Sequence, residues 1–151
     1  MSTAFIHCCR LVVLAALVTG CASTGPPFQL TEPQANSALI YLYRPASMVS
    51  GGNYYLASVN GKVVARLKPG SYFALELPPG GVVVACKAAS AFGICWPGNV
   101  DGALEEFLET DQFEVTGGSR YFVHFPSGKR ISSVAEALAQ IAGTEMLAPP
   151  R

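Results

Sequence analysis

The amino-acid sequence predicts an all-β protein, an antiparallel β-sandwich of about seven strands with one short C-terminal helix. Three observations indicate this fold class. Apolar and polar residues alternate with a period of two in many short segments between residues 37 and 125. The chain contains 15 Gly and 11 Pro, which favour frequent turns. No long helical pattern separates the strand-like segments, so two sheets that bury one core between them are the natural solution.

Turn residues mark where the predicted strands end. Asn60-Gly61 predicts a two-residue hairpin, because both residue types tolerate positive φ. Lys68-Pro69-Gly70, Pro78-Pro79-Gly80-Gly81 and Gly117-Gly118 predict three further turns. The expected strands are 37–44, 54–59, 62–67, 71–77, 82–87, 111–116 and 119–125.

The predicted helix begins near Ser133. Ser133 and Glu136 fit a capping box, in which the serine caps the helix and the glutamate reaches back. Gly143 is placed to end the helix. An apolar stripe at helical spacing would pack on the sandwich and consists of Val134, Leu138 and Ile141.

The N-terminus has the layout of an export signal. Arg10 precedes the apolar run 11–18. As a helix this run spans only about 12 Å, whereas a bilayer core is about 30 Å thick. It therefore predicts a cleaved signal peptide rather than a membrane-spanning helix.

The run ends in Val18-Thr19-Gly20-Cys21, which resembles the lipobox of bacterial lipoproteins. In such a motif the cysteine sulfur accepts a diacylglyceryl group, and cleavage falls between Gly20 and Cys21. Ala22 follows instead of Asp, which favours the outer membrane facing the periplasm if the host is Gram-negative. The alternative is an ordinary signal with an incidental Cys21, which would release a secreted soluble module.

The predicted organisation has four parts. Residues 1–20 form the signal peptide, and 21–36 form a flexible, proline-containing tether. Residues 37–143 form the sandwich with its helix, and 144–151 form a loose tail. The lipid on Cys21 would make the membrane a partner of the chain.

Composition excludes some functions. Lys plus Arg and Asp plus Glu both number 10, so the chain lacks the basic surface that general nucleic-acid binding requires. Only two histidines are present, and His7 lies in the predicted signal peptide. No pattern indicates a cofactor or a metal site.

Four residues from the end of strand 82–87 to the start of strand 111–116 are candidate site residues. Cys86 and Cys95 remain after Cys8, Cys9 and Cys21 are assigned to the signal and the lipid, so they predict a disulfide in an exported domain. Two buried free thiols are the alternative. Phe92 lies between these cysteines and Trp96 directly follows Cys95, and together they form a candidate docking loop. Alternatively, Trp96 folds back over the core.

His124 is the histidine that remains in the mature chain. It alternates with Tyr121, Val123 and Phe125, so we expect it on the opposite strand face together with Phe122. A structural role is expected, and a hydrolase that uses His124 with a nearby carboxylate is the alternative. The acidic residues between Asp101 and Glu114 lack the order of a calcium loop and predict a solvated face.

Several motifs occur in an order that resembles a bacterial lipoprotein family catalogued as domain of unknown function 2846. They are Ala38-Leu39-Ile40-Tyr41-Leu42-Tyr43-Arg44-Pro45, Val59-Asn60-Gly61-Lys62, Gly70-Ser71-Tyr72-Phe73 and Leu77-Pro78-Pro79-Gly80, with Val115-Thr116-Gly117-Gly118-Ser119-Arg120-Tyr121-Phe122-Val123 as a closing hairpin. The resemblance implies a sandwich of the carboxypeptidase-regulatory-like or Ig-like kind and supplies no established catalytic residues. Residues 88–109 look like an insertion. We therefore expect a non-enzymatic, membrane-anchored binding or structural module with an envelope protein as its partner.

Overall fold

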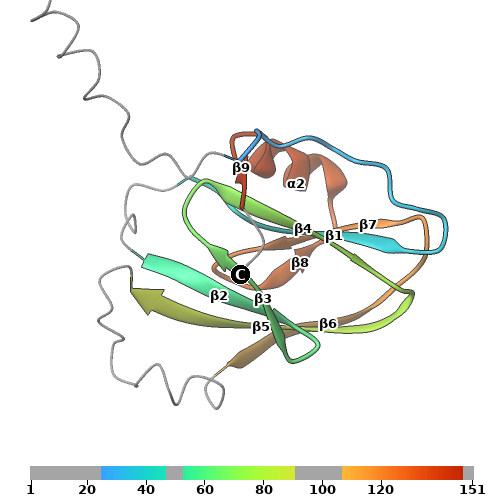
Figure 1. Cartoon of the computed structure of the whole chain (residues 1–151), viewed down its shortest axis with the longest axis horizontal. Coiled ribbons are helices and arrows are strands. Elements are labelled where there is room, and N and C mark those ends of the chain that lie inside the picture. Colours follow the sequence, from blue (N-terminus) through green and yellow to red (C-terminus); the bar gives the residue numbers. More distant parts are fainter. Residues whose placement is uncertain (1–24, 47–52, 91–106, 148–151) are drawn as a thin grey trace, which may run out of the picture.

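The strand β1 (Ala38–Arg44) lies at the centre of the molecule, and all seven of its residues are buried. The computed structural model describes residues 25–46, 53–90 and 107–147 (Figure 1). One face of β1 packs against a second sheet, and the other face lies beneath a helix and the N-terminal residues. A strand covered on both sides is apolar throughout, which explains the continuous run Ala-Leu-Ile-Tyr-Leu-Tyr.

Two sheets form a sandwich, so the predicted all-β class is confirmed. The first sheet has the strand order β8-β7-β1-β4-β9, and the second has the order β3-β2-β5-β6. The remaining strands of the first sheet are β4 (Ser71–Leu77), β7 (Arg120–His124), β8 (Lys129–Ile131) and β9 (Glu145–Met146). The second sheet contains β2 (Asn53–Val59), β3 (Lys62–Leu67), β5 (Gly80–Ser90) and β6 (Leu108–Val115). All seven predicted strands are present, and β8 and β9 are additional.

The first sheet is mixed, whereas the sequence predicted antiparallel pairing throughout. β7 pairs with β1 in parallel, and β9 pairs with β4 in parallel. The chain enters β7 from β6, which belongs to the other sheet, so β7 is not constrained to run against β1 as a hairpin partner would be. The second sheet is antiparallel, as predicted.

The hairpin between β2 and β3 forms at the predicted residues. Asn60 and Gly61 have φ of 49° and 76°, the double positive φ that this turn requires. The Asn60 Oδ1 also accepts a hydrogen bond of 2.8 Å from the backbone N–H of Val83. The asparagine therefore turns the chain and ties the hairpin to β5.

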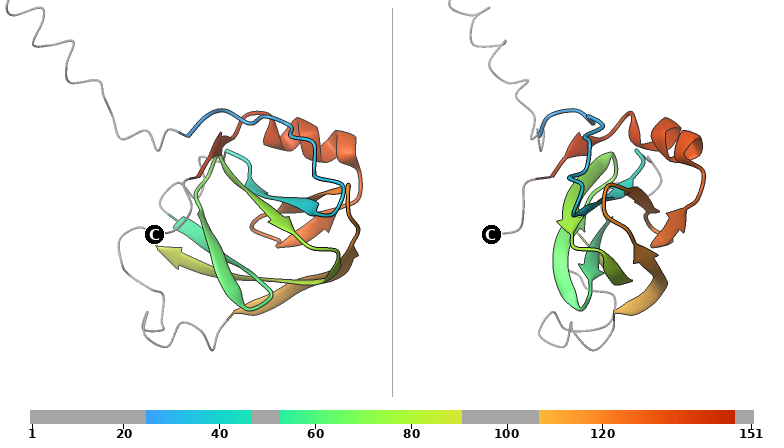
Figure 2. Two further views of the ribbon diagram at one scale, coloured as in Figure 1. Left: turned by 45° about the vertical axis from the view of Figure 1, so that its right-hand side comes forward. Right: turned by 90° about the vertical axis from the view of Figure 1, so that its right-hand side faces the viewer.

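The molecule has two apolar layers. The inner layer lies between the sheets and includes Ile40, Leu42 and Val84. The outer layer lies between the first sheet and the helix α2 (Val134–Ile141) and includes Tyr41 and Phe122. Figure 2 shows α2 and residues 25–36 on the same side of the sandwich.

The helix begins as predicted, since the Ser133 Oγ accepts the backbone N–H of Glu136 at 3.3 Å. The Glu136 carboxylate instead accepts a bond from Gln140, so the reciprocal half of the capping box is absent. Ala137 and Ile141 are fully buried, while Val134 is 51% exposed, which corrects the predicted stripe. The C-cap is Ala142, and Gly143 follows it at the position where glycine commonly ends a helix, although its φ is not positive. In the part of the chain that the structure describes, no helix has the length and hydropathy to cross a bilayer.

Residues 25–36, which we call the N-terminal strap, lie along the outer layer instead of forming a free tether. Phe28 packs its ring edge-on against both Tyr41 and Tyr72, with centroids 5.4 and 5.3 Å away. The Thr31 N–H donates to the Tyr41 hydroxyl at 2.8 Å. An ion pair between Arg120 and Glu32 adds little, because the Glu32 side chain is 83% exposed. Burial of the Phe28 ring is thus what turns this proline-containing segment into ordered structure.

The predicted loose tail is also ordered as far as Leu147. β9 pairs with Ser71 and Tyr72 of β4, and Thr144 is 1% exposed. The strap covers the open edge of β9, with Met146 N–H donating to Pro26 O at 2.9 Å. Residues 25–28 and 144–147 therefore complete one edge of the first sheet together.

Candidate functional site

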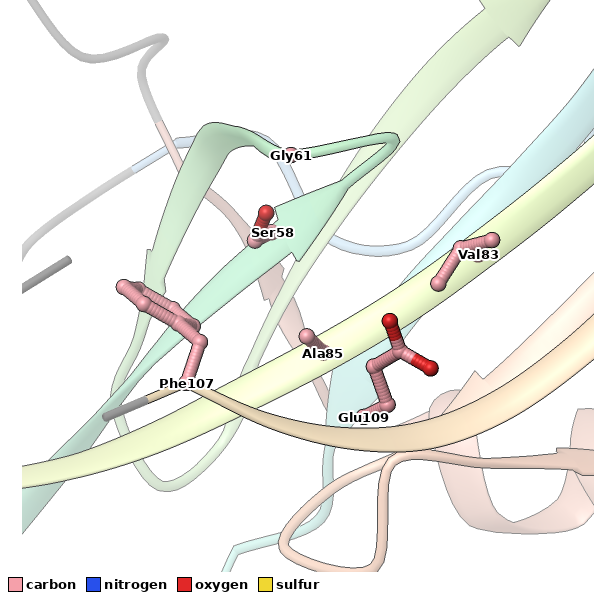
Figure 3. Close-up of a pocket in the computed structure, with 6 residues that line it drawn as sticks. All are labelled: Ser58, Gly61, Val83, Ala85, Phe107 and Glu109. Carbon is pink, nitrogen blue, oxygen red and sulfur yellow. The ribbon is translucent and has the colours of Figure 1, made fainter. Parts of the chain in front are cut away.

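A pocket opens on the outer face of the four-stranded sheet (Figure 3). Its volume is about 160 Å³. Ala85 forms part of its floor, with the Phe107 ring on one side and the Glu109 carboxylate on the other. The residues that line it are Ser58, Gly61, Val83, Ala85, Phe107 and Glu109.

Three neighbouring strands bring these side chains together. Ala85 of β5 pairs with Ser58 of β2 on one side and with Glu109 of β6 on the other. Residues directly opposite one another in a sheet present their side chains on the same face, so a hydroxyl and a carboxylate flank a small floor residue. The pocket therefore rests on a rigid sheet rather than on a loop.

An irregularity in β6 places Glu109 on the outer face. The register shifts between Val84 and Ala85, which leaves Thr110 as an extra residue in β6. Thr110 is buried, and its Oγ1 lies 2.9 Å from Gly128 O and 3.2 Å from Val84 O. Because one extra residue reverses the alternation of side chains, Glu109 faces solvent instead of the core.

The size and lining of the pocket limit what it can hold. Cofactor and drug sites usually measure about 300–1,000 Å³, whereas a cavity of about 150 Å³ holds a benzene-sized group. An aromatic ring, an exposed carboxylate and a hydroxyl suit a cationic group with an apolar stem. The Glu109 carboxylate makes no ion pair with the residues that the structure describes. The arrangement fits one lysine or arginine side chain.

Of the candidate site residues from the sequence, Gly20, Cys21, Phe92, Cys95 and Trp96 lie outside the described residues. Cys86 lies half-buried on β5 and forms no disulfide with another residue that the structure describes. Burial raises the pKa of the Cys86 thiol, which disfavours the nucleophilic thiolate at neutral pH. The pairing of Cys86 with Cys95 stays a prediction.

His124 lies on the predicted strand face, beneath α2. Its ring packs edge-on against Tyr43, with centroids 5.6 Å apart, and its Nδ1 is 3.2 Å from the Ser127 Oγ. The Ser127 hydroxyl in turn donates to the carbonyl oxygen of His124 at 2.9 Å. The Ser127 hydroxyl proton is thus bonded to a backbone carbonyl of the same turn. This bond stabilises the turn and does not activate the serine as a nucleophile.

Burial is the main influence on the pKa of His124 and lowers it, while nearby Glu136 opposes the shift. The unfolded chain therefore binds a proton on His124 at a higher pH than the folded chain does. The contribution of neutral His124 to the free energy of unfolding should be fully present above about pH 6.5 and should be lost as the pH falls toward the folded-state pKa. We expect His124→Gln to flatten this part of the pH dependence. Urea unfolding of the native protein and of His124→Gln at pH 7.5 and pH 5 measures this pH dependence. An equal loss of unfolding free energy in both proteins between the two pH values would contradict the expectation.

Within the acidic run between Asp101 and Glu114, the residues that the structure describes have different roles. Glu109 and Glu114 are exposed. Asp111 instead accepts backbone N–H bonds from Arg130 at 2.7 Å and Gln112 at 3.0 Å. Within the ranges given above, no three His, Cys, Asp or Glu side chains are grouped as metal ligands.

A family model described as "Protein of unknown function (DUF2846)" matches residues 34–136. The chain belongs to this family. The resemblance noted in the sequence is therefore confirmed. No curated protein and no solved structure gives a significant match.

The DUF2846 match covers β1 to β8 and the first turn of α2, including every residue that lines the pocket. It excludes most of the strap and all of β9. The pocket itself was missed by sequence reasoning, which placed Glu109 in an insertion and gave Ser58 no role. The one available signal was Phe107 followed by Glu109, an aromatic and a carboxylate two residues apart at the start of a strand.

Proposed function

We propose that this chain is a bacterial envelope lipoprotein, anchored through acyl chains on Cys21, whose sandwich is a non-enzymatic binding module. The anchor is supported by the short apolar run 11–18 and by the lipobox-like Val18-Thr19-Gly20-Cys21. In a Gram-negative host the module would face the periplasm from the outer membrane.

The pocket carries the binding part of the proposal. It is too small for a cofactor and lies on the outer face of the four-stranded sheet, so a single side chain from another protein fits it best. Phe107 offers an aromatic face to a cation, Glu109 offers the opposite charge, and Ser58 offers a hydroxyl. The proposed partner is an envelope protein that inserts a lysine or arginine.

A hydrolase based on His124 has less support. Ser127 is the hydroxyl beside the ring, but it already donates to a backbone carbonyl. The ring itself is packed against Tyr43, and burial lowers its pKa. These contacts account for His124 as a structural residue of the β7–β8 turn.

A photo-crosslinking experiment tests the binding module. Gln112 is exposed on β6 opposite Val83, so p-benzoylphenylalanine in place of Gln112 would sit beside the pocket in intact cells. We expect a discrete adduct with an envelope protein. Glu109→Gln should weaken the adduct about fivefold or more, because a charged contact at the centre of an interface is worth more than about 1 kcal/mol.

Glu114→Gln is the matched control. Glu114 lies on the same strand and is also exposed, but it does not line the pocket. The adduct should survive this change. An adduct that is insensitive to Glu109→Gln, or that both variants weaken equally, would contradict a lysine- or arginine-binding pocket.

A further inference from the structure

The strap fixes where the chain leaves the folded domain. Gly25 lies so close to β9 that a Cβ on it would overlap the Met146 carbonyl. Pro26 O accepts the Met146 N–H at 2.9 Å, and Phe28 N–H donates to Thr144 O at 2.9 Å. The strap is therefore bound along its first residues, and the exit point lies at the edge formed by Gly25, Pro26, Pro27 and β9.

Very little chain separates this exit point from Cys21. Four peptide units join Cys21 to Gly25, and at about 3.6 Å per residue they span at most about 14 Å. A free tether over residues 21–36 would instead reach about 50 Å. Whatever conformation the link has, the β9 edge cannot lie farther than about 14 Å from the anchored Cys21.

The pocket lies on the opposite side of the molecule from the strap. The strap and α2 cover the outer face of the first sheet, whereas the pocket opens on the outer face of the second sheet (Figures 1 and 2). Both sheets and their core separate them. Two packed sheets with a helix layer measure roughly 20 Å across.

We infer that the strap docks the β9 edge against the lipid headgroups and so holds the pocket facing away from the bilayer. This inference rests on the proposed acylation of Cys21, and its partner is a lipid surface. Met146, which is 36% exposed, presents an apolar side chain at this edge. The short link limits the tilt of the domain, so the pocket is presented to proteins away from the bilayer rather than to the lipid.

Paramagnetic relaxation in vesicles measures this orientation. The acylated protein, purified from membranes with its N-terminal mass checked, is placed in phosphatidylcholine vesicles that contain a gadolinium-chelating lipid. The relaxation effect falls with the sixth power of distance. In the inferred orientation Met146, in the first sheet, lies nearer the bilayer than Gln112, in the second, by about one sheet spacing of roughly 10 Å. We therefore expect the Met146 amide to relax about tenfold faster, or more, than the Gln112 amide beside the pocket.

A chain-length variant isolates the role of the strap. Ten Gly and Ser residues inserted after Ser23 add about 33 Å of reach without touching a strap contact, and should abolish the difference between the two amides. Replacing residues 22–24 by Gly and Ser at the same length should preserve it. Equal relaxation at Met146 and Gln112 in the acylated native chain overturns the inference, whereas an N-terminus without acyl mass overturns the proposed function instead.

Discussion

Replacing Cys21 by Ser is expected to leave the precursor uncleaved and without acyl chains. In the proposed lipoprotein the sulfur at this position is the nucleophile that forms the thioether, and a serine hydroxyl is a far weaker nucleophile at neutral pH. Two palmitoyl-length chains contribute on the order of 20 kcal/mol to membrane attachment, at about 0.8 kcal/mol for each buried methylene. Loss of the chains therefore removes the anchor altogether. Metabolic labelling with palmitate and the intact mass of the protein measure the change.

Cys86→Ser provides the control for this experiment. It makes the same chemical change in a half-buried thiol of β5, far along the chain from the signal. Labelling and processing should remain as in the native chain. Normal cleavage and labelling of Cys21→Ser would refute the lipoprotein hypothesis and leave the secreted soluble module in its place.

The sequence contained enough information for the main strands because their signals are local. Asn60-Gly61 specifies its hairpin through backbone preference alone, and the alternation of Tyr121, Val123 and Phe125 correctly placed His124 on the other face. β8 and β9 contain only three and two residues, too few to show any periodicity. They form because neighbouring strands offer an open edge.

The strap and the pocket depend on partners that a linear reading does not show. Phe28 sits among prolines and polar residues, which indicate a linker, until Tyr41 and Tyr72 provide a surface for its ring. Glu109 faces the pocket because Thr110 is an extra residue in the pairing of β5 with β6. A bulge changes which residues share a face, so alternation counted along β6 alone assigns Glu109 to the wrong side.

That bulge leads to the second large expected effect, at Gly128 in the β7–β8 turn. Gly128 has a φ of 61°, and a Cβ there would overlap the side chain of Thr110. Left-handed backbone costs a non-glycine residue roughly 1–2 kcal/mol, and overpacking adds roughly 1–3 kcal/mol. We expect Gly128→Ala to lower the free energy of unfolding by about 2–5 kcal/mol in urea titrations.

Gly118→Ala separates the two contributions, because Gly118 has a similar φ of 72° but nothing within 4 Å of a built Cβ. It should lose only the backbone part, about 1–2 kcal/mol. Equal losses in the two variants would mean that the contact with Thr110 has no energetic weight. If Gly128→Ala loses more stability than Gly118→Ala, the β7–β8 turn of the first sheet stabilises the Thr110 bulge of the second sheet. That bulge in turn fixes the outward position of Glu109. The family fold would then build its pocket through a contact between the sheets, so a change in the β7–β8 turn should also weaken partner binding at a surface that the turn does not touch.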